Sequence, residues 1–345
     1  MKKQVNWGII GLGNIATKFA EALKLTENAK LKGISSKSKD KILKFKNLYG
    51  IKSSYCFSKY SDLINCDEIE VVYIALPNSL HYQYICECIE ANKKILVEKP
   101  ATQNFSEIKA LKDNYDMSQF FYSEGFMYFH NPQISNIIKL LKNKKIGNLL
   151  SIKSKFGKNI LKKKNIFGLE IIKKQNIKNR LFNPSLGGGV ILDLGCYPAS
   201  LSTLIGSIYF DLDINNIKVE KVKKQMGSTG VEVDASAEIN FNNKFYANIE
   251  ASFTRNIGSE SEIIGDKGRI IIKDTWHSAS SAILISNDIE KEITNDAKNN
   301  SYFYQIKNIS HSILEKENKP YQPVMDFDKS YINMKILDEW KNYDK

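Results

Sequence analysis

Residues 5–25 read VNWGIIGLGNIATKFAEALKL, and this stretch decides the fold of the N-terminal half of the chain. An apolar run ends where Gly11, Gly13 and Ala16 fit the pattern G-x-G-x-x-A, and an amphipathic stretch follows. In this pattern the first glycine permits a tight turn, the second lets a pyrophosphate approach the backbone, and the alanine lets the helix pack close to the strand. The stretch therefore predicts a strand, a phosphate-binding turn and a helix. A glycine-rich turn that binds nothing is the alternative interpretation.

The first 123 residues alternate short apolar runs with amphipathic stretches, which is typical of a doubly wound parallel sheet. The expected strands are 5–10, 31–35, 71–75, 95–98 and 120–123, and the expected helices are 14–25, 40–49, 81–91 and 106–114. We interpret residues 1–123 as an α/β domain of the Rossmann type that binds a dinucleotide.

Residues 124–345 follow a different pattern, which predicts an α+β domain with an open, largely antiparallel sheet. The expected helices are 132–141 and 190–204, and the expected strands are 149–156, 235–241, 245–253 and 269–273. Asn242 and Asn243 predict the turn between two of these strands. The tail 301–340 is expected to be helical at both ends, with its last helix a candidate for packing back onto the first domain. The Lys-rich stretch 158–178 is interpreted as a long loop or partly helical flap over the site, or as a surface insertion without a role.

Composition excludes several classes of protein. The net charge is +12, but only Arg180, Arg255 and Arg269 are arginines and the lysines are dispersed, which argues against nucleic-acid binding. The five cysteines are an odd set without metal-type spacing, and the four histidines stand far apart. We therefore expect a reducing, cytoplasmic compartment and no structural metal. No apolar run approaches the roughly 18 residues that a membrane helix requires, so we expect no membrane segment.

The end of the second expected strand bears on the choice of cofactor. A chain that binds NAD usually carries Asp or Glu there to hold the ribose hydroxyls. This chain reads Ser35, Ser36, Lys37, Ser38 instead. A 2′-phosphate would meet no carboxylate at this place, and Lys37 and the serine hydroxyls could bind it. The sequence therefore favours NADP over NAD, with NAD as the alternative.

Several short motifs follow one another in a fixed order. They are residues 7–16, residues 71–81 ending in Pro77-Asn78-Ser79-Leu80-His81, Glu98-Lys99-Pro100, Glu124-Gly125-Phe126-Met127 with Pro132, and Arg180 followed by residues 187–197. In this order they resemble the glucose-fructose oxidoreductase, inositol dehydrogenase and MocA (Gfo/Idh/MocA) family over nearly the whole chain. The chain departs from the family at Phe129, His130 and Asn131, where similar sequences commonly carry an Arg.

The resemblance implies a nucleotide domain, a sheet domain that often mediates homodimers or homotetramers, and a small polyhydroxylated substrate between them. It implies that Lys99 precedes a proline in a bend, often with a cis bond. The expected cofactor-binding residues are Gly11, Gly13, Asn14, Ile15, Ser35, Ser36, Lys37, Leu76, Pro77, Asn78, His81, Glu98 and Lys99. The expected substrate-binding residues are Lys99, Arg180, Asp193 and Tyr197. For His81 a structural role at a helix start is the alternative, and for Arg180 a surface ion pair.

Three residues suit the chemistry of hydride transfer at an alcohol carbon, where a proton must leave or join the oxygen. Tyr197 can carry that proton if its pKa falls from about 10 toward neutrality. One ammonium about 4 Å away, at an effective dielectric constant near 20, supplies on the order of 4 kcal/mol, so Lys99 could activate it. Asp193 lies four positions before Tyr197 and shares its helix face, where it could bind a substrate hydroxyl. One alternative is that Lys99 itself carries the proton. Roles without chemistry also remain open: Asp193 as a helix cap, Tyr197 as a half-buried aromatic residue and Lys99 as a surface cation.

The predicted function is that of an NADP-preferring dehydrogenase or reductase of a sugar, cyclitol or related polyol. One alternative keeps this chemistry but uses an anionic sugar, which the Lys-rich stretch would attract. The other is a non-catalytic NADP-binding sensor or co-regulator, because a fold can outlive its chemistry.

Overall fold

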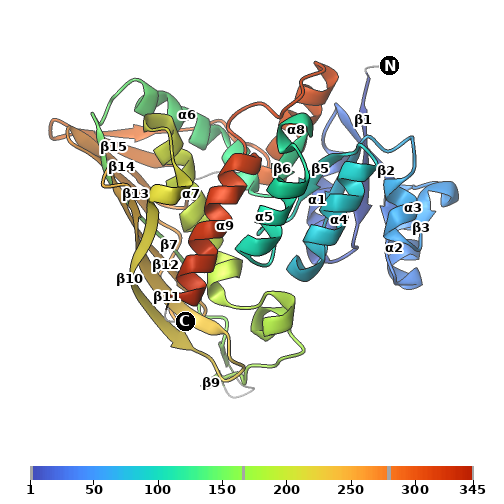
Figure 1. Ribbon diagram of the computed structural model, residues 1–345, viewed down its shortest axis with the longest axis horizontal. Helices are drawn as coiled ribbons and strands as arrows, with labels where there is room; N and C mark the ends of the chain where they lie inside the picture. Colours follow the sequence, from blue (N-terminus) through green and yellow to red (C-terminus); the bar gives the residue numbers. More distant parts are fainter. Residues whose placement is uncertain (1–2, 165–167, 278–280, 344–345) are drawn as a thin grey trace. The chain divides into compact units, whose positions relative to one another are not determined.

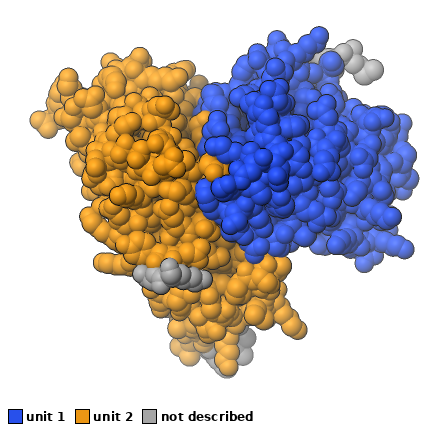
Figure 2. Space-filling view, viewed as in Figure 1, with its two compact units in different colours: residues 1–131, 298–328 blue, residues 132–297, 329–345 orange. Residues whose placement is uncertain are grey.

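The computed structural model describes residues 3–164, 168–277 and 281–343. The chain forms two compact units, which Figure 2 shows in separate colours. Unit 1 comprises Met1–Asn131 and Lys298–Asp328, and unit 2 comprises Pro132–Ala297 and Lys329–Lys345. The division after Asn131 lies a little beyond the boundary expected after residue 123, and a segment of the C-terminal tail belongs to unit 1.

Unit 1 contains a six-stranded parallel sheet with the order β3-β2-β1-β4-β5-β6. Its strands are β1 (Val5–Ile10), β2 (Ala29–Ser35), β3 (Cys56–Phe57), β4 (Val71–Ile74), β5 (Lys94–Val97) and β6 (Tyr122–Glu124). Its helices are α1 (Asn14–Lys24), α2 (Lys39–Tyr49), α3 (Tyr60–Ile64), α4 (His81–Glu90), α5 (Phe105–Asn114) and α8 (Ser301–Leu314). This is the doubly wound order in which ligands bind at the carboxyl ends of the strands, beside the reversal between β1 and β4. The predicted fold class of this half is confirmed, although the short β3 and α3 were not predicted.

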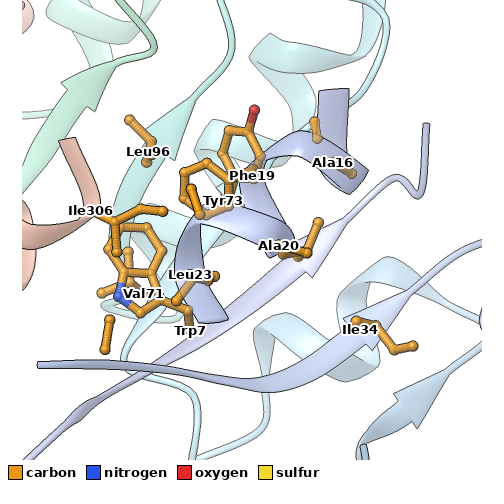
Figure 3. Packing of buried hydrophobic residues seen from close by; sticks show 14 of the residues in the cluster. Trp7, Ala16, Phe19, Ala20, Leu23, Ile34, Val71, Tyr73, Leu96 and Ile306 are labelled. Carbon is orange, nitrogen blue, oxygen red and sulfur yellow. The ribbon is translucent and has the colours of Figure 1, made fainter. Parts of the chain in front are cut away.

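The core of unit 1 is built around aromatic side chains from β1, α1 and β4 (Figure 3). The rings of Phe19 and Tyr73 stack at 3.9 Å, and Trp7 packs against Phe19 at 5.5 Å. Helix α8 joins this core through Ile306, and Trp7 Nε1 donates a hydrogen bond to Ser310 Oγ at 3.0 Å. The helix of the tail that packs on the N-terminal sheet is therefore α8, whereas the last helix lies almost wholly in unit 2.

Unit 2 contains an eight-stranded sheet with the order β10-β11-β12-β7-β13-β14-β15-β16. Its strands are β7 (Leu149–Gly157), β10 (Ile217–Met226), β11 (Glu232–Phe241), β12 (Tyr246–Ser252), β13 (Ser261–Gly265), β14 (Gly268–Ile272), β15 (Ala282–Ser286) and β16 (Ile289–Ile293). Neighbours are antiparallel except β12 and β7, which are parallel. Helices α6 (Pro132–Lys142), α7 (Cys196–Tyr209) and α9 (Phe327–Asn342) lie on one face of the sheet (Figure 1). The predicted α+β class is confirmed.

The turn predicted at Asn242 and Asn243 is present between β11 and β12. Both residues have a φ of 57°, the left-handed conformation that two-residue hairpin turns require and that asparagine tolerates better than most residues. The local sequence was therefore sufficient to predict this hairpin.

The Lys-rich segment is partly a loop, as predicted, and contains no helix among its described residues; residues 165–167 lie outside the described part of the chain. Two short strands, β8 (Lys162–Lys164) and β9 (Glu170–Ile172), pair antiparallel within it and were not predicted. The β-branched pair Ile171 and Ile172 favours a strand, and Lys162 pairs with Glu170 across the hairpin at 2.8 Å. The high density of lysines concealed this pattern in the sequence.

The expectation about apolar runs also needs a correction. Residues Pro184–Tyr209 form a helical stretch of 26 residues that is long and apolar enough to cross a membrane, with a mean hydropathy of 1.3 in its most apolar window. The continuous helical part begins after Gly189, which has a φ of 114°, and runs through Gly195 and Pro198 to Tyr209. Because 89% of that window is buried, the stretch has the character of a core helix.

Candidate functional site

The turn after β1 has the geometry of a phosphate cradle. Gly11 has a φ of +89°, and a Cβ there would lie 2.5 Å from the Ala75 carbonyl oxygen, so only glycine fits. A Cβ on Gly13 would meet nothing within 4 Å, so the space above its backbone is open. Helix α1 begins at Asn14 with no side-chain cap and no acidic residue in its first turn. The backbone N–H groups of Asn14 and Ile15 therefore suit the pyrophosphate of a dinucleotide.

The end of β2 carries hydroxyl groups and one exposed lysine. Ser35 is fully buried, and its Oγ has no hydrogen-bond partner among the described residues. Ser36 Oγ accepts the Ser38 N–H at 3.2 Å, and Ser38 caps helix α2. Lys37 between them is exposed, and the first carboxylate beyond the strand is that of Asp40, within the helix. This local chemistry accommodates a 2′-phosphate.

His81 joins two loops of unit 1. It is fully buried, with Nε2 2.9 Å from the Leu76 carbonyl oxygen and Nδ1 2.9 Å from the Pro100 carbonyl oxygen. A neutral imidazole can donate to only one of these oxygens, and an imidazolium to both. His81 thus contacts two segments. One is the loop of Leu76, Pro77 and Asn78, and the other is the bend that follows Lys99. This arrangement fits the structural role left open for His81.

Lys99 stands at the carboxyl end of β5, before a cis peptide bond to Pro100, as the resemblance implied. The bend is held from β6, where the Glu124 carboxylate accepts the Ala101 N–H at 2.8 Å. The neighbouring Glu98 carboxylate is buried and accepts a hydrogen bond from the Tyr73 hydroxyl. Glu124 is a supporting residue that the sequence analysis quoted only as part of a motif and did not assign.

Asp193 and Tyr197 lie on one continuous helical stretch of unit 2. The predicted helix is confirmed, but its first part, Ile191–Gly195, is a π-helix that α7 continues. Single π turns occur frequently at functional sites, and one such turn keeps residues four apart on nearly the same face. Arg180 Nη2 donates to Asp193 Oδ1 at 3.2 Å. The surface ion pair considered for Arg180 therefore exists, with Asp193 as its partner.

Tyr197 lies against two aromatic residues that sequence reasoning missed. The ring of Phe156, on β7, meets it edge-on with the centroids 5.3 Å apart, and the Trp276 ring lies 5.4 Å away. These neighbours fix the plane of the phenol and keep its surroundings apolar. No local pattern identified them, because Phe156 comes from β7 and Trp276 from the turn after β14, both distant from Tyr197 in the sequence.

Each unit thus gathers its own share of the predicted residues. Unit 1 brings the predicted cofactor residues to the carboxyl ends of β1, β2, β4 and β5, and unit 2 brings together Arg180, Asp193 and Tyr197. Among the residues that the structure describes, no group of three or more His, Cys, Asp or Glu side chains is arranged to hold a metal ion.

His130, one of the residues that depart from the family pattern, lies in the core of unit 1. Its Nδ1 is 3.5 Å from Asn308 Nδ2, and its Nε2 has no hydrogen-bond partner among the described residues. Burial lowers the pKa of His130 from 6.5 to about 3. A neutral, space-filling imidazole thus occupies the region where similar sequences commonly carry an Arg.

The buried His130 predicts acid sensitivity. Below pH 6.5 the unfolded chain takes up a proton at this residue and the folded chain does not, so stability falls with decreasing pH by about 1.4 kcal/mol per pH unit. Urea unfolding at about pH 7.5 and about pH 5 measures the loss, and His130→Gln should reduce it by about 2 kcal/mol. The exposed His277 provides the control, since His277→Gln should leave the loss unchanged. Equal pH dependence in wild type and His130→Gln would contradict the prediction.

Two family descriptions match the chain. Residues 5–126 match the oxidoreductase family with an NAD-binding Rossmann fold, and residues 134–271 match the GFO/IDH/MocA C-terminal domain. Between them, these matches cover parts of both compact units.

Named relatives agree with these matches. The chain is 25% identical over 345 residues to trans-1,2-dihydrobenzene-1,2-diol dehydrogenase of Xenopus tropicalis, covering 96% of each chain. It is 28% identical over 265 residues to glucose-6-phosphate 3-dehydrogenase of Bacillus subtilis, covering 75% of this chain and 72% of the relative. A 3-ketoreductase from Actinomadura kijaniata, solved with NADP and TDP-benzene, shares the fold with a TM-score of 0.78 and 20% identity, covering 98% of this chain and 97% of the other. The chain belongs to the Gfo/Idh/MocA family, as an NAD(P)-dependent dehydrogenase or reductase that acts on a CH–OH group.

Proposed function

We propose that this enzyme transfers a hydride between NADP and a hydroxyl- or carbonyl-bearing carbon of a sugar, cyclitol or related polyol. The observation that carries the proposal is the pair Asp193 and Tyr197 on one helical stretch, with Arg180 bound to the aspartate. A carboxylate and a phenol side by side can accept one substrate hydroxyl and exchange the proton of another. When bound, NADP or NADPH accepts or supplies the hydride.

In this proposal Tyr197 exchanges a proton with the substrate oxygen, and Lys99 stabilises the phenolate. Phe156 and Trp276 hold the ring, so its hydroxyl has a defined direction. Lys99 belongs to unit 1 and Tyr197 to unit 2, so the mechanism requires the Lys99 ammonium to approach the phenol to about 4 Å. Lys99 as the direct proton carrier remains the alternative assignment.

Asp193 is proposed to orient the substrate by accepting a hydroxyl hydrogen bond. Arg180 donates to the same carboxylate, which holds its orientation. The run Gly187, Gly188, Gly189 precedes the helix. Gly188 and Gly189 are packed against the backbone of Arg180 and Asn183 and against the Glu232 carboxylate, so their lack of a side chain serves the packing of this segment.

The test is turnover of NADP and NADPH against a panel of sugars, cyclitols and ketosugars, with Tyr197→Phe as the control. The proposal requires turnover that the substitution abolishes. Tight cofactor binding without such turnover on any member of the panel would refute it.

The hydroxyl-rich end of β2 predicts a preference for NADP. Lys37→Ala should weaken NADPH binding by about tenfold, as expected for one charge-assisted contact, and leave NADH binding unchanged. Fluorescence titration with both cofactors measures the effect. Lys44→Ala, at an exposed position within α2, is the matched control because it removes the same charge. Tighter binding of NADH than NADPH by the wild-type protein would contradict the preference.

An anionic sugar is the second candidate substrate. Two observations favour it: the Lys-rich segment 158–178 leads directly to Arg180, and two relatives are named for, or solved with, phosphorylated compounds. A Michaelis constant that rises steeply with salt would select this candidate, and a salt-independent value the neutral polyol.

We also propose a homodimer or homotetramer formed through the sheet of unit 2, on the face opposite α6, α7 and α9. Light scattering at several concentrations measures the assembly.

All five cysteines are free thiols, which is consistent with the proposed cytoplasmic location.

A further inference from the structure

A buried carboxylate lies beneath the segment that carries Asp193. Glu232 is the first residue of β11 and is only 3% exposed. Sequence analysis gave it no role, because it is one of many acidic residues and lies far along the chain from residues 187–197. Its Oε1 has no hydrogen-bond partner among the described residues. Carboxylates are rarely buried without a close cationic partner, so this one needs an explanation.

The contacts of Glu232 are with the backbone just before Asp193. A Cβ on Gly189 would lie 2.6 to 2.9 Å from the three atoms of the Glu232 carboxyl group, so the carboxylate lies directly against this glycine. The backbone N–H of Glu232 itself and, more weakly, that of Ile191 favour the ionised form of the carboxyl group. Lys224 and Lys341 are near enough for their charge to act on it, although burial has the larger effect and raises the pKa of Glu232.

These contacts satisfy the start of the helical stretch. The first N–H groups of a helix have no partner within the helix and are usually capped by a side chain that precedes it. Here Gly189 occupies the capping place, since its carbonyl accepts the Asp193 N–H at 3.2 Å, and glycine has no side chain with which to cap. The Glu232 carboxyl group lies against this place from another strand, and its negative charge suits the positive end of the helix.

The same segment is supported at its other end by Trp340 of α9. A Cβ on Gly195 would lie 2.7 Å from the Trp340 ring. Glycines at positions 189 and 195 therefore let the π-helix rest on two large side chains, one from β11 and one from α9. Asp193 lies between the two supports.

We infer that Glu232 is a positioning residue, which caps the Gly189–Ile191 backbone from β11 and so sets where Asp193 and Tyr197 point toward the substrate. The inference rests on the proposed function, because it assigns Glu232 to the same reaction. If Glu232 acts by accepting a hydrogen bond rather than through its charge, glutamine at position 232 should keep most of the activity. An apolar residue of similar size should not.

The test compares Glu232→Gln with Glu232→Met in steady-state kinetics. Glu232→Met should lower kcat/KM by about tenfold or more at a temperature well below its Tm, and Glu232→Gln should stay within about threefold of wild type. Affinity for NADPH should not change, since unit 1 carries the proposed dinucleotide residues. The matched control is Glu238→Met on the same strand, where the carboxylate pairs with Lys221 on the other face of the sheet.

Three results would overturn the inference. One is a kcat/KM for Glu232→Met within about twofold of wild type, and another is an equal loss in Glu238→Met. If Glu232→Met does not fold, hydrogen exchange of the wild-type protein decides, because rapid exchange at Ile191 would show that its N–H has no cap. If the wild-type protein shows no turnover that the Tyr197→Phe substitution removes, the proposed function is refuted. If the wild-type protein turns over normally and Glu232→Met does not change its rate, this inference alone is refuted.

Discussion

Replacing Tyr197 by phenylalanine is expected to lower kcat/KM by about 10²- to 10⁴-fold, the range typical of a lost general acid or base. The substitution removes one oxygen atom and keeps the ring that packs against Phe156 and Trp276. The Tm should therefore change little, and NADPH binding not at all. Steady-state rates with the best substrate of the panel, together with a fluorescence titration of NADPH, measure both effects.

Tyr209→Phe is the matched control for this substitution. Tyr209 ends the same helix, and its hydroxyl donates to the Gly147 carbonyl oxygen at 3.3 Å, away from Asp193. Loss of that hydroxyl should leave kcat/KM unchanged. If Tyr197→Phe retained wild-type kcat/KM, the proton would have to travel through another group, and Lys99 would be the next candidate.

Replacing Lys99 by methionine is expected to lower kcat/KM by about 10²- to 10³-fold, because one ammonium at about 4 Å contributes on the order of 4 kcal/mol to a phenolate. Without the ammonium, the phenol should regain its ordinary pKa. Alcohol oxidation needs the phenolate as base. The oxidation rate of the variant should therefore rise at a higher pH than that of the wild type. The measurement is the pH profile of kcat/KM for oxidation in wild type and variant.

Two comparisons make the Lys99 prediction specific. Lys94→Met removes the same charge at the opposite end of β5 and should leave the pH profile in place. The double variant Lys99→Met/Tyr197→Phe should be hardly worse than Tyr197→Phe alone, because the two residues act as a unit. Fully additive losses would show that Lys99 does not act through the phenol.

The confirmed predictions concern structure that neighbouring residues specify. The strand at residues 5–10 and the helix that begins at Asn14 follow from apolar periodicity and from Gly11, whose conformation and tight surroundings admit no side chain. The turn at Asn242 and Asn243 follows from their tolerance of positive φ. In each case the cause and the structure lie within a few residues, so a single stretch of sequence contained the information.

The unpredicted features depend on residues far apart in the chain. Trp7 donates a hydrogen bond to Ser310, which lies 303 positions later in the sequence, where α8 packs in the core of unit 1. Strands β8 and β9 pair where the density of lysines concealed their pattern, and the π-helix at Asp193 packs on side chains from β11 and α9. Packing supplied the free energy that local propensity lacked at these places.

The candidate site divides in the same way. The side chains proposed to carry the chemistry could be selected from the order of the residues, since Gly11, Lys99, Asp193 and Tyr197 stand in recognisable motifs. What holds those side chains is not, because Phe156, Trp276 and Glu232 reach them through folding alone. A motif is a property of consecutive residues, whereas burial, capping from another strand and ring packing arise only when distant segments are brought into contact.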